Sequence, residues 1–206
     1  MREVCFLVVA YLSGSVFYAR VFGLLLTHKD ITAGTKDGNP GTANAFQHGG
    51  LMCGTLTLIC ELLKGFLPVY LYLQERSPSG CPAVFALILA APVLGHAFPI
   101  FYGFHGGKGI AVSFGCLLGL YRAYWLWAAL LLAAPFLFFS LILCVTPHFY
   151  RTVWTYISSS LLMFLIPAKT VWVGMLMISG IVLLRLHLST EVREEMQVRI
   201  LGIHAR

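Results

Sequence analysis

The chain has 206 residues, of which 59% are hydrophobic and only 11% are charged, and its mean hydropathy is +0.84. This composition excludes an ordinary soluble domain and is typical of an integral membrane protein, because no soluble core of this size needs so much apolar surface. The formal net charge of +6 suits a leaflet of anionic lipid and gives little reason to expect a nucleic-acid partner.

Apolar segments of roughly 17–25 residues can cross a bilayer as helices, and the chain offers about seven candidates. We therefore expect an all-α, polytopic membrane helix bundle with about seven transmembrane helices, forming a single domain over residues 1–206. The fourth segment is short for a span, and the sixth must extend back through Val153 to reach the required length. In chain order the segments are Val4–Leu26, Leu51–Gln74, Pro82–Phe101, Ile110–Tyr121, Ala123–Val145, Tyr156–Ile166 and Thr170–Leu188.

The Lys and Arg residues of the short loops predict the orientation of the bundle. With the N-terminus outside and the C-terminus in the cytoplasm, more than half of the 14 Lys and Arg residues fall on the cytoplasmic side. We expect Val4–Leu26 to be a retained membrane helix, because no Ala-x-Ala cleavage site closes it. The stretch Thr190–Arg199 carries Glu and Arg at three- and four-residue spacing, which predicts a solvated helix.

Two glycine-rich loops interrupt this apolar chain, and both fall on the cytoplasmic side of the expected topology. Glycine lets backbone N–H groups converge on an anion, and a following helix N-terminus adds partial positive charge. The loops therefore predict phosphate binding, although a plain membrane turn is an alternative for either loop alone. The loops are "GTKDGNPGTAN", Gly34–Asn44, and "GHAFPIFYGFHGGKGIA", Gly95–Ala111. The candidate phosphate-binding residues are Gly38, Asn39, Gly41, Thr42, Asn44, Gly106, Gly107, Lys108 and Gly109.

Charged and titratable residues near these loops complete the candidate site. Glu61 and Lys64 stand three residues apart on one helical face, inside a predicted span where charge is costly; they predict a site, an ion pair that locks the bundle, or both. His96 could donate a hydrogen bond to an oxyanion. Arg185 and Glu191 could reach the same surface. The six cysteines have no metal-ligand spacing, so we expect no metal site. The other histidines, which we do not include in the site, are His28, His48, His148, His187 and His204.

The motifs "GSVFYARVFG", "DIT", "DGNPGTAN", "ELLKG" and "GHAFPIFYGFHGGKGIA", in that order and spacing, resemble the bacterial acyl-phosphate:glycerol-3-phosphate acyltransferases of the PlsY type. The resemblance runs from Gly14 to about Gly119. It implies a seven-helix enzyme of the bacterial inner membrane with its active site facing the cytoplasm. The reaction would transfer a fatty acyl group from acyl phosphate to the 1-hydroxyl of glycerol 3-phosphate, giving lysophosphatidic acid and phosphate, without metal, coenzyme A or another cofactor.

This resemblance, together with the loop chemistry, makes His96, Lys108 and Asn39 the catalytic candidates, supported by Glu61, Lys64, Arg185 and Glu191. The chain departs from the family pattern at several polar positions. Asp37 replaces a serine, Gln47 an arginine, and His105 a lysine, while Ser179 and Val182 stand where the family tends to have histidine and asparagine. These changes keep two alternatives open: a relative that binds acyl phosphate or lysolipid without turnover, and a transporter of a small phosphorylated metabolite.

Overall fold

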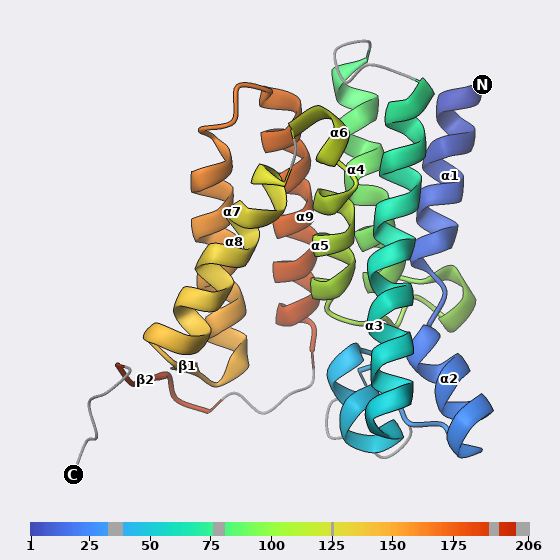
Figure 1. Cartoon of the computed structure of the whole chain (residues 1–206), viewed down its shortest axis with the longest axis vertical. Coiled ribbons are helices and arrows are strands. Elements are labelled where there is room, and N and C mark those ends of the chain that lie inside the picture. Colours follow the sequence, from blue (N-terminus) through green and yellow to red (C-terminus); the bar gives the residue numbers. More distant parts are fainter. Residues whose placement is uncertain (33–38, 76–80, 125, 190–193, 201–206) are drawn as a thin grey trace.

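The computed structural model of the chain is a bundle of helices aligned roughly along one axis (Figure 1). It describes residues 1–32, 39–75, 81–124, 126–189 and 194–200. The helices are α1 (Arg2–Gly14), α2 (Tyr18–Thr27), α3 (Thr42–Glu75), α4 (Pro82–Ala97), α5 (Ile110–Leu118), α6 (Tyr121–Tyr124), α7 (Trp127–Leu137), α8 (His148–Met163) and α9 (Lys169–His187). A 3-10 turn, η1 (Ile100–Tyr102), follows α4, and a π-helical turn, η2 (Phe138–Ile142), follows α7. The strands β1 (Val145–Thr146) and β2 (Gln197–Val198) have two residues each.

The mostly helical fold confirms the expected class. By length and composition, three of the described helical segments could cross a membrane, namely α3, α4 with η1, and α9; the bent pair α1–α2 could form a fourth span. The helices α5, α7 and α8 are shorter, with 9, 11 and 16 residues. Every predicted segment contains helix, but the number of crossings stays a prediction.

The first predicted segment is wrong as one continuous helix, because the chain bends by 41° between α1 and α2. Gly14 lies directly against the backbone of α4, where a Cβ on it would approach the Pro92 carbonyl oxygen to 2.1 Å. Phe17 then takes an extended conformation before α2 begins. The break leaves the Val16 carbonyl outside the helical hydrogen-bond ladder, so it can accept a hydrogen bond from elsewhere.

The long helix α3 is also interrupted, at Gly50, where φ is 79° and ψ is −178°. Glycine adopts this positive φ without a steric penalty, whereas other residues rarely do. Residues 42–49 therefore form a separate short helix before the long part of α3. The predicted segment Leu51–Gln74 coincides with the part after the break.

Close backbone contacts hold the centre of the bundle together. A Cβ on Gly65 of α3 would lie 2.4 Å from the Val112 carbonyl oxygen of α5, and a Cβ on Gly115 of α5 would lie 2.1 Å from the Leu62 carbonyl oxygen. Small residues at such positions let membrane helices approach closely, which replaces the hydrophobic driving force that lipid cannot supply. The pair α3–α5 is thereby fixed next to both glycine-rich loops.

Two helix boundaries and one element differ from the sequence predictions. The sixth segment begins at His148 rather than at Val153 or Tyr156, directly after Pro147. The fifth segment is divided into α6 and α7 and continues into η2. The helix predicted over Thr190–Arg199 is wrong for its described part, since Gln197–Val198 pairs antiparallel with Val145–Thr146. Isolated short helices are marginal in water, so backbone pairing with β1 outweighs a few surface charge pairs.

The N-terminus lies at one end of the bundle, and both glycine-rich loops lie at the other (Figure 1). The chain descends through α1 and α2, rises through α3 and descends again through α4, so that residues 39–41 and 98–109 meet at the same end. The lower ends of α5, α8 and α9 and the strands β1 and β2 lie there as well. This end is where the candidate site forms.

Candidate active site

A cavity of about 1130 Å³ lies at the end of the bundle that holds the glycine-rich loops. Its lining has two chemical characters, one polar and one apolar. The polar and glycine lining residues are Asn39, Gly41, Thr42, Asn44, Gln47, His48, Glu61, His96, Lys108, Gly109, His148, Arg151 and Thr152. The apolar lining residues are Ala43, Leu58, Leu62, Ile110, Ala111, Phe114, Leu118 and Phe136. A substrate with a charged head and an apolar tail fits both.

The N-termini of α3, α5 and α8 all contribute residues to this lining. Thr42 opens α3, Ile110 opens α5 and His148 opens α8. The first N–H groups of a helix have no intrahelical acceptor and carry partial positive charge, which favours an anion. Their convergence on one cavity therefore supports the phosphate binding that the glycine-rich loops predict.

The described part of the first loop begins at Asn39. The Asn39 carbonyl oxygen accepts a 2.8 Å hydrogen bond from Nδ2 of Asn44, which fixes the loop to the first turn of α3. A Cβ on Gly41 would lie 3.2 Å from Nδ2 of Asn39, so the turn leaves little room there. Gly38 and Asp37 lie outside the described residues. Asn39, Gly41, Thr42 and Asn44 all line the cavity, and their binding of phosphate stays a prediction.

The second loop is packed against the end of α4 through its glycines. A Cβ on Gly106 would lie 2.0 Å from the His96 carbonyl oxygen. The Gly107 N–H donates a 3.0 Å hydrogen bond to that same oxygen. A Cβ on Gly107 would lie 2.3 Å from His96 Nε2 and 2.8 Å from Asn39 Oδ1. Gly107 thus sits where His96 and the first loop meet, which joins the two loops into one site.

Arg185 of α9 secures this loop from behind the cavity lining. Its guanidinium donates two hydrogen bonds to the Gly106 carbonyl oxygen, of 2.9 Å from Nε and 2.6 Å from Nη2. Hydrogen bonds from a charged donor are stronger than neutral ones. Arg185 therefore acts in this structure as a support for the loop. Glu191, its predicted companion, lies outside the described residues.

Lys108 brings a full positive charge into the cavity, with only 8% of its surface exposed. Its ammonium contacts Nε2 of His148, a residue that the sequence analysis set aside. Gly109 follows with φ of 78° and ends the loop directly before α5. Lys108 and Asn39, one from each glycine-rich loop, line the same cavity.

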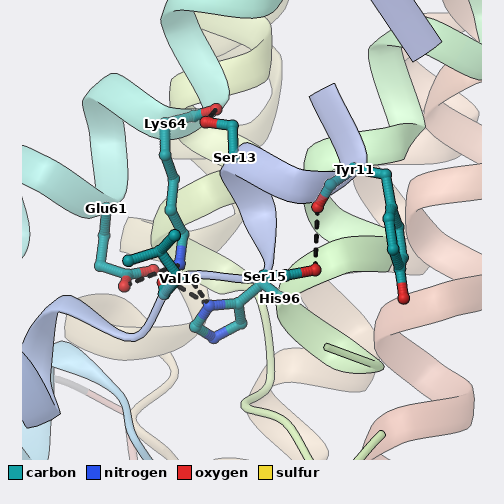
Figure 2. A network of polar contacts seen from close by, with 7 residues as sticks. All are labelled: Tyr11, Ser13, Ser15, Val16, Glu61, Lys64 and His96. Carbon is teal, nitrogen blue, oxygen red and sulfur yellow. Dashed lines mark hydrogen bonds and ion pairs between the residues drawn. The ribbon is translucent and has the colours of Figure 1, made fainter. Parts of the chain in front are cut away.

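Behind the loops lies a buried network of charge, shown in Figure 2. The Lys64 ammonium lies 2.9 Å from Glu61 Oε1, and it donates a 2.7 Å hydrogen bond to the Val16 carbonyl. It also lies 3.0 Å from His96 Nδ1. Glu61 Oε2 lies 3.1 Å from the same ring nitrogen. Glu61, Lys64 and His96 are all nearly fully buried. Because Glu61 and His96 also line the cavity, the buried ion pair adjoins the candidate site.

The ring of His96 is held by both members of the ion pair. Its Nδ1 lies 3.0 Å from the Lys64 ammonium and 3.1 Å from Glu61 Oε2, so this nitrogen accepts a hydrogen bond from Lys64 in one tautomer and donates one to Glu61 in the other. In either tautomer the second ring nitrogen, Nε2, lies next to Gly107, where an added Cβ would approach it to 2.3 Å. The ion pair therefore fixes the ring with Nε2 toward the second loop.

Comparison with known proteins agrees with this geometry. The sequence profile of the family described as glycerol-3-phosphate acyltransferase matches residues 4–193. The chain belongs to the glycerol-3-phosphate acyltransferase family. The relatives include the glycerol-3-phosphate acyltransferase of Shewanella halifaxensis, 41% identical over 109 residues, which are 52% of each chain. That of Streptococcus thermophilus is 34% identical over 137 residues, 65% of this chain and 61% of the relative.

The chain spans about half to three-fifths of the length of the curated relatives it matches. Its fold extends further than the sequence match. Two crystal structures of PlsY, described as an integral membrane glycerol 3-phosphate acyltransferase, superpose with TM-scores of 0.73, covering 90% of this chain and 88% of theirs. One is the glycerol 3-phosphate form, 25% identical, and the other is the lysophosphatidic acid form, 24% identical.

The positions at which this acyltransferase-family chain departs from the family pattern have different environments. Gln47 lines the cavity, so the missing arginine changes the site itself. Ser179 does not line it; its hydroxyl shares a 2.8 Å hydrogen bond with Ser160 between α9 and α8. Val182 lies near Gly109, 3.9 Å from where a Cβ on that glycine would be. The C-terminal departures therefore affect helix packing behind the loop.

Sequence reasoning missed the wall that α8 contributes. His148, Arg151 and Thr152 all line the cavity, but the predicted sixth segment started after them. Pro147 was the available signal, because proline is common at helix starts and rare inside helices. With the helix begun at His148, the three-residue spacing to Arg151 places both side chains on one face of the first turn.

Among the described residues, no group of His, Cys, Asp and Glu could hold a metal ion.

Proposed function

We propose that this chain transfers a fatty acyl group from acyl phosphate to the 1-hydroxyl of glycerol 3-phosphate, as a single membrane domain over residues 1–206. The hydroxyl oxygen attacks the acyl carbonyl carbon, the bond from that carbon to the phosphate oxygen breaks, and the proton of the hydroxyl leaves with the released phosphate. The products are lysophosphatidic acid and inorganic phosphate. Family membership and the forms of the solved PlsY structures, named for glycerol 3-phosphate and lysophosphatidic acid, support this proposal.

One observation carries the proposal: a single cavity is lined both by residues of the two glycine-rich loops and by apolar residues. Along α5, lining residues run from Gly109 to Leu118, which is about 13 Å at the rise of an α-helix. Phe114 and Leu118 of that helix line the same cavity as Leu58 and Leu62 of α3. A fatty chain can lie in this apolar part while its phosphate stays among the helix N-termini.

The residues have distinct roles in the proposed reaction. Lys108 and the N–H groups that begin α3 and α5 hold phosphate, because positive charge in a buried site strengthens anion binding. In the tautomer whose Nδ1 accepts from Lys64, the Nε2–H of His96 donates a hydrogen bond to the oxyanion that develops on the acyl carbonyl. Asn39 positions glycerol 3-phosphate beside Gly107. Acyl phosphate is already activated, so positioning and charge neutralisation provide the catalysis, and no cofactor is needed.

The proposed location is the bacterial inner membrane, with the N-terminus outside and the active site facing the cytoplasm. The distribution of Lys and Arg over the loops supports this orientation. Glycerol 3-phosphate is water-soluble and the acyl chain is not, so the site belongs at the boundary between the two phases. The glycine-rich loops lie at one end of the bundle, opposite the N-terminus, in keeping with this arrangement (Figure 1).

The test is a turnover assay with purified protein in detergent or nanodiscs, using palmitoyl phosphate and glycerol 3-phosphate and measuring lysophosphatidic acid and phosphate together. We expect equimolar products from the wild type and none above background from Lys108→Ala. Lys169→Ala is the matched control, because Lys169 is exposed at the start of α9, outside the cavity. Full activity in Lys108→Ala overturns the role of the second loop. Tight binding of both substrates without any turnover supports the sensor alternative instead.

A further inference from the structure

The second glycine-rich loop exposes three large apolar side chains on the outside of the molecule. Ile100 is 51% exposed, Phe101 is 59% exposed and Phe104 is 56% exposed. They fall within the six residues "PIFYGF", residues 99–104, which carry no charge. Together, Ile100, Phe101 and Phe104 form the apolar loop tip. Neighbouring exposed side chains of this size mark a surface that contacts a partner or lipid.

The turn that carries the apolar loop tip satisfies many of its own polar backbone groups. The N–H groups of Tyr102 and Phe104 donate hydrogen bonds of 3.2 Å and 2.9 Å to the Pro99 carbonyl, and the His105 N–H donates one of 3.2 Å to the Tyr102 carbonyl. The Gly103 carbonyl accepts a 2.7 Å hydrogen bond from His105 Nδ1. A segment that enters lipid needs such internal partners, because lipid chains supply none.

Tyr102 and the backbone at Phe98 dock this turn on the break between α1 and α2. The Tyr102 ring stacks on the Phe17 ring with centroids 4.2 Å apart, and the Arg20 guanidinium carbon lies 5.7 Å from the centre of the Tyr102 ring. The hydroxyl of Tyr11 in α1 donates a 2.8 Å hydrogen bond to the Phe98 carbonyl. With Tyr102 turned toward the bundle, the apolar loop tip is left facing outward.

The turn lies on the flank of the bundle and not at its extreme end. Figure 1 shows it in the lighter green that follows α4, beside the lower end of α1, with α2 continuing below it. From Arg20, which contacts Tyr102, α2 runs seven more residues to Thr27, which is about 10 Å at the rise of an α-helix. The bent pair α1–α2 exposes apolar side chains before and after the break, namely Val4, Val8, Val9, Val21, Leu24, Leu25 and Leu26. The apolar loop tip is therefore continuous with a lipid-facing surface.

The charges beside the turn favour lipid chains over an acidic partner. The Arg20 Nε lies 3.0 Å from Asp30 Oδ2, so its charge is already paired. Arg and Tyr side chains, with apolar bodies and polar tips, are typical of the boundary between headgroups and acyl chains. A protein approaching from water would also have to displace the lipid around Leu24 and Leu25 to reach the apolar loop tip.

We propose that the apolar loop tip inserts into the boundary between the headgroups and the acyl chains of the leaflet at the loop end of the bundle. Its partner is the lipid bilayer itself, recognised through apolar contact and not through headgroup charge. Insertion fixes the depth of the second glycine-rich loop from outside, while Arg185 holds Gly106 from inside. The inference goes beyond the proposed acyl transfer, because it concerns where the loop lies and not what the cavity binds.

The experiment measures the depth of residue 101 in the full chain, reconstituted in nanodiscs. In a cysteine-free background, Phe101→Cys carries a nitroxide spin label. Power saturation then compares collisions of the label with oxygen, which concentrates in lipid, and with a nickel chelate, which stays in water. We expect oxygen to relax the label more strongly, at a depth of about 5–10 Å below the lipid phosphates. Adding phosphatidylglycerol to phosphatidylcholine nanodiscs should leave this depth unchanged.

Two labelled positions calibrate the measurement. Leu67→Cys lies on the exposed face of α3, a helix long enough to span a membrane, and should favour oxygen. Arg122→Cys lies exposed in α6 at the opposite end of the bundle and should favour the nickel chelate.

A second measurement uses no label and provides the test if a labelled variant fails to fold, which a thermal unfolding curve would reveal. Phe101→Asp places a charge where lipid begins, so it should expel the turn and speed amide hydrogen exchange at residues 98–105 by about tenfold in nanodiscs. Phe101→Leu keeps the apolar contact and should exchange like the wild type. Lys169→Ala, at the start of α9, should leave exchange in this segment unchanged.

Each other outcome overturns the proposal. A label at residue 101 that favours the nickel chelate as strongly as the one at residue 122 places the apolar loop tip in water. Shielding from both reagents indicates contact with protein, such as a second copy of the chain. Insertion only with phosphatidylglycerol makes the contact electrostatic, and unchanged exchange in Phe101→Asp removes the anchor. The assay with palmitoyl phosphate tests acyl transfer separately from all of these.

Discussion

The Lys64 ammonium donates a 2.7 Å hydrogen bond to the Val16 carbonyl (Figure 2). This carbonyl is available as an acceptor because the chain breaks between α1 and α2 and takes it out of the helical hydrogen-bond pattern. This contact couples the bend of the first membrane segment to the buried charges of α3. The same ammonium contacts His96, so the bend also contributes to the orientation of a candidate catalytic side chain. The bend between α1 and α2 thereby helps to position a side chain of the candidate site, although it is far from the loops in sequence.

Replacing Lys64 should destabilise the whole bundle. The variant Lys64→Met leaves Glu61 buried without its partner, and breaking one half of a buried ion pair costs about 3–5 kcal/mol. We expect a large drop in the thermal unfolding midpoint in detergent. The double variant Glu61→Leu with Lys64→Met should recover much of that loss, because no uncompensated charge remains.

Lys169→Met is the control for this measurement, since Lys169 is exposed and its ammonium lies over the face of the Phe164 ring. Its effect should be about 1 kcal/mol or less. Equal destabilisation by Lys64→Met and Lys169→Met would contradict the role of the buried network.

Gly107→Ala should abolish turnover with only a moderate effect on folding. The added Cβ would lie 2.3 Å from His96 Nε2 and 2.8 Å from Asn39 Oδ1, so either the ring or the first loop must move. Displacements of this size at a reacting centre cost about 100-fold or more in rate. Product formation from palmitoyl phosphate, measured at saturating substrate, tests the change in kcat.

A glycine of the same chain serves as the matched control. A Cβ on Gly180 of α9 meets no atom within 4 Å. Gly180→Ala should therefore leave turnover unchanged and raise stability slightly, because alanine favours helix by about 1 kcal/mol over glycine. Activity equal to wild type in Gly107→Ala would show that this contact does not organise the site.

Arg185→Gln should loosen the second loop without removing a cavity-lining residue. The variant loses two hydrogen bonds from a charged donor to the Gly106 carbonyl, which together are worth about 2–3 kcal/mol. We expect a 10- to 100-fold lower kcat/KM and faster amide hydrogen exchange at residues 103–109. Lower activity with unchanged exchange in that segment would mean that Arg185 acts on substrate directly and not through the loop.

Leu118→Trp should shorten the acyl chains that the protein accepts. Leu118 lines the apolar end of the cavity, one helix length from Lys108, so a larger side chain there removes space that the end of a fatty chain would occupy. We expect the ratio of kcat/KM for palmitoyl over decanoyl phosphate to fall about tenfold, with decanoyl phosphate itself little affected. An unchanged ratio would place the fatty chain elsewhere.

The orientation in the membrane can be tested by cysteine labelling in sealed, right-side-out vesicles. His105 is exposed in the second glycine-rich loop. Arg122 is exposed in α6, which lies at the opposite end of the bundle (Figure 1). In a cysteine-free background, Arg122→Cys should react with an impermeant maleimide added outside, and His105→Cys should react only after the vesicles are opened. The reverse pattern would invert the proposed topology.

The sequence was sufficient for the membrane class and for most helical segments. Composition determines that the chain belongs in a bilayer, and a lysine flanked by glycines, as at Lys108, predicts anion binding from local chemistry alone. The sequence could not reveal that Arg185 donates hydrogen bonds to the Gly106 carbonyl, because residues far apart in sequence meet only through packing. The C-terminal segment was misjudged for the same reason, since β1 offered Gln197 and Val198 a partner that helical spacing does not show.

What the sequence by itself determined was therefore local: apolar length, glycine placement, and the three-residue spacing that pairs Glu61 with Lys64. Only the tertiary structure decided which groups share a cavity. The bend after Gly14 frees the Val16 carbonyl for Lys64, and the early start of α8 brings Arg151 to the cavity wall. Both depend on close contacts between helices, and such contacts are set by the shape of the assembled bundle, which no short stretch of sequence contains.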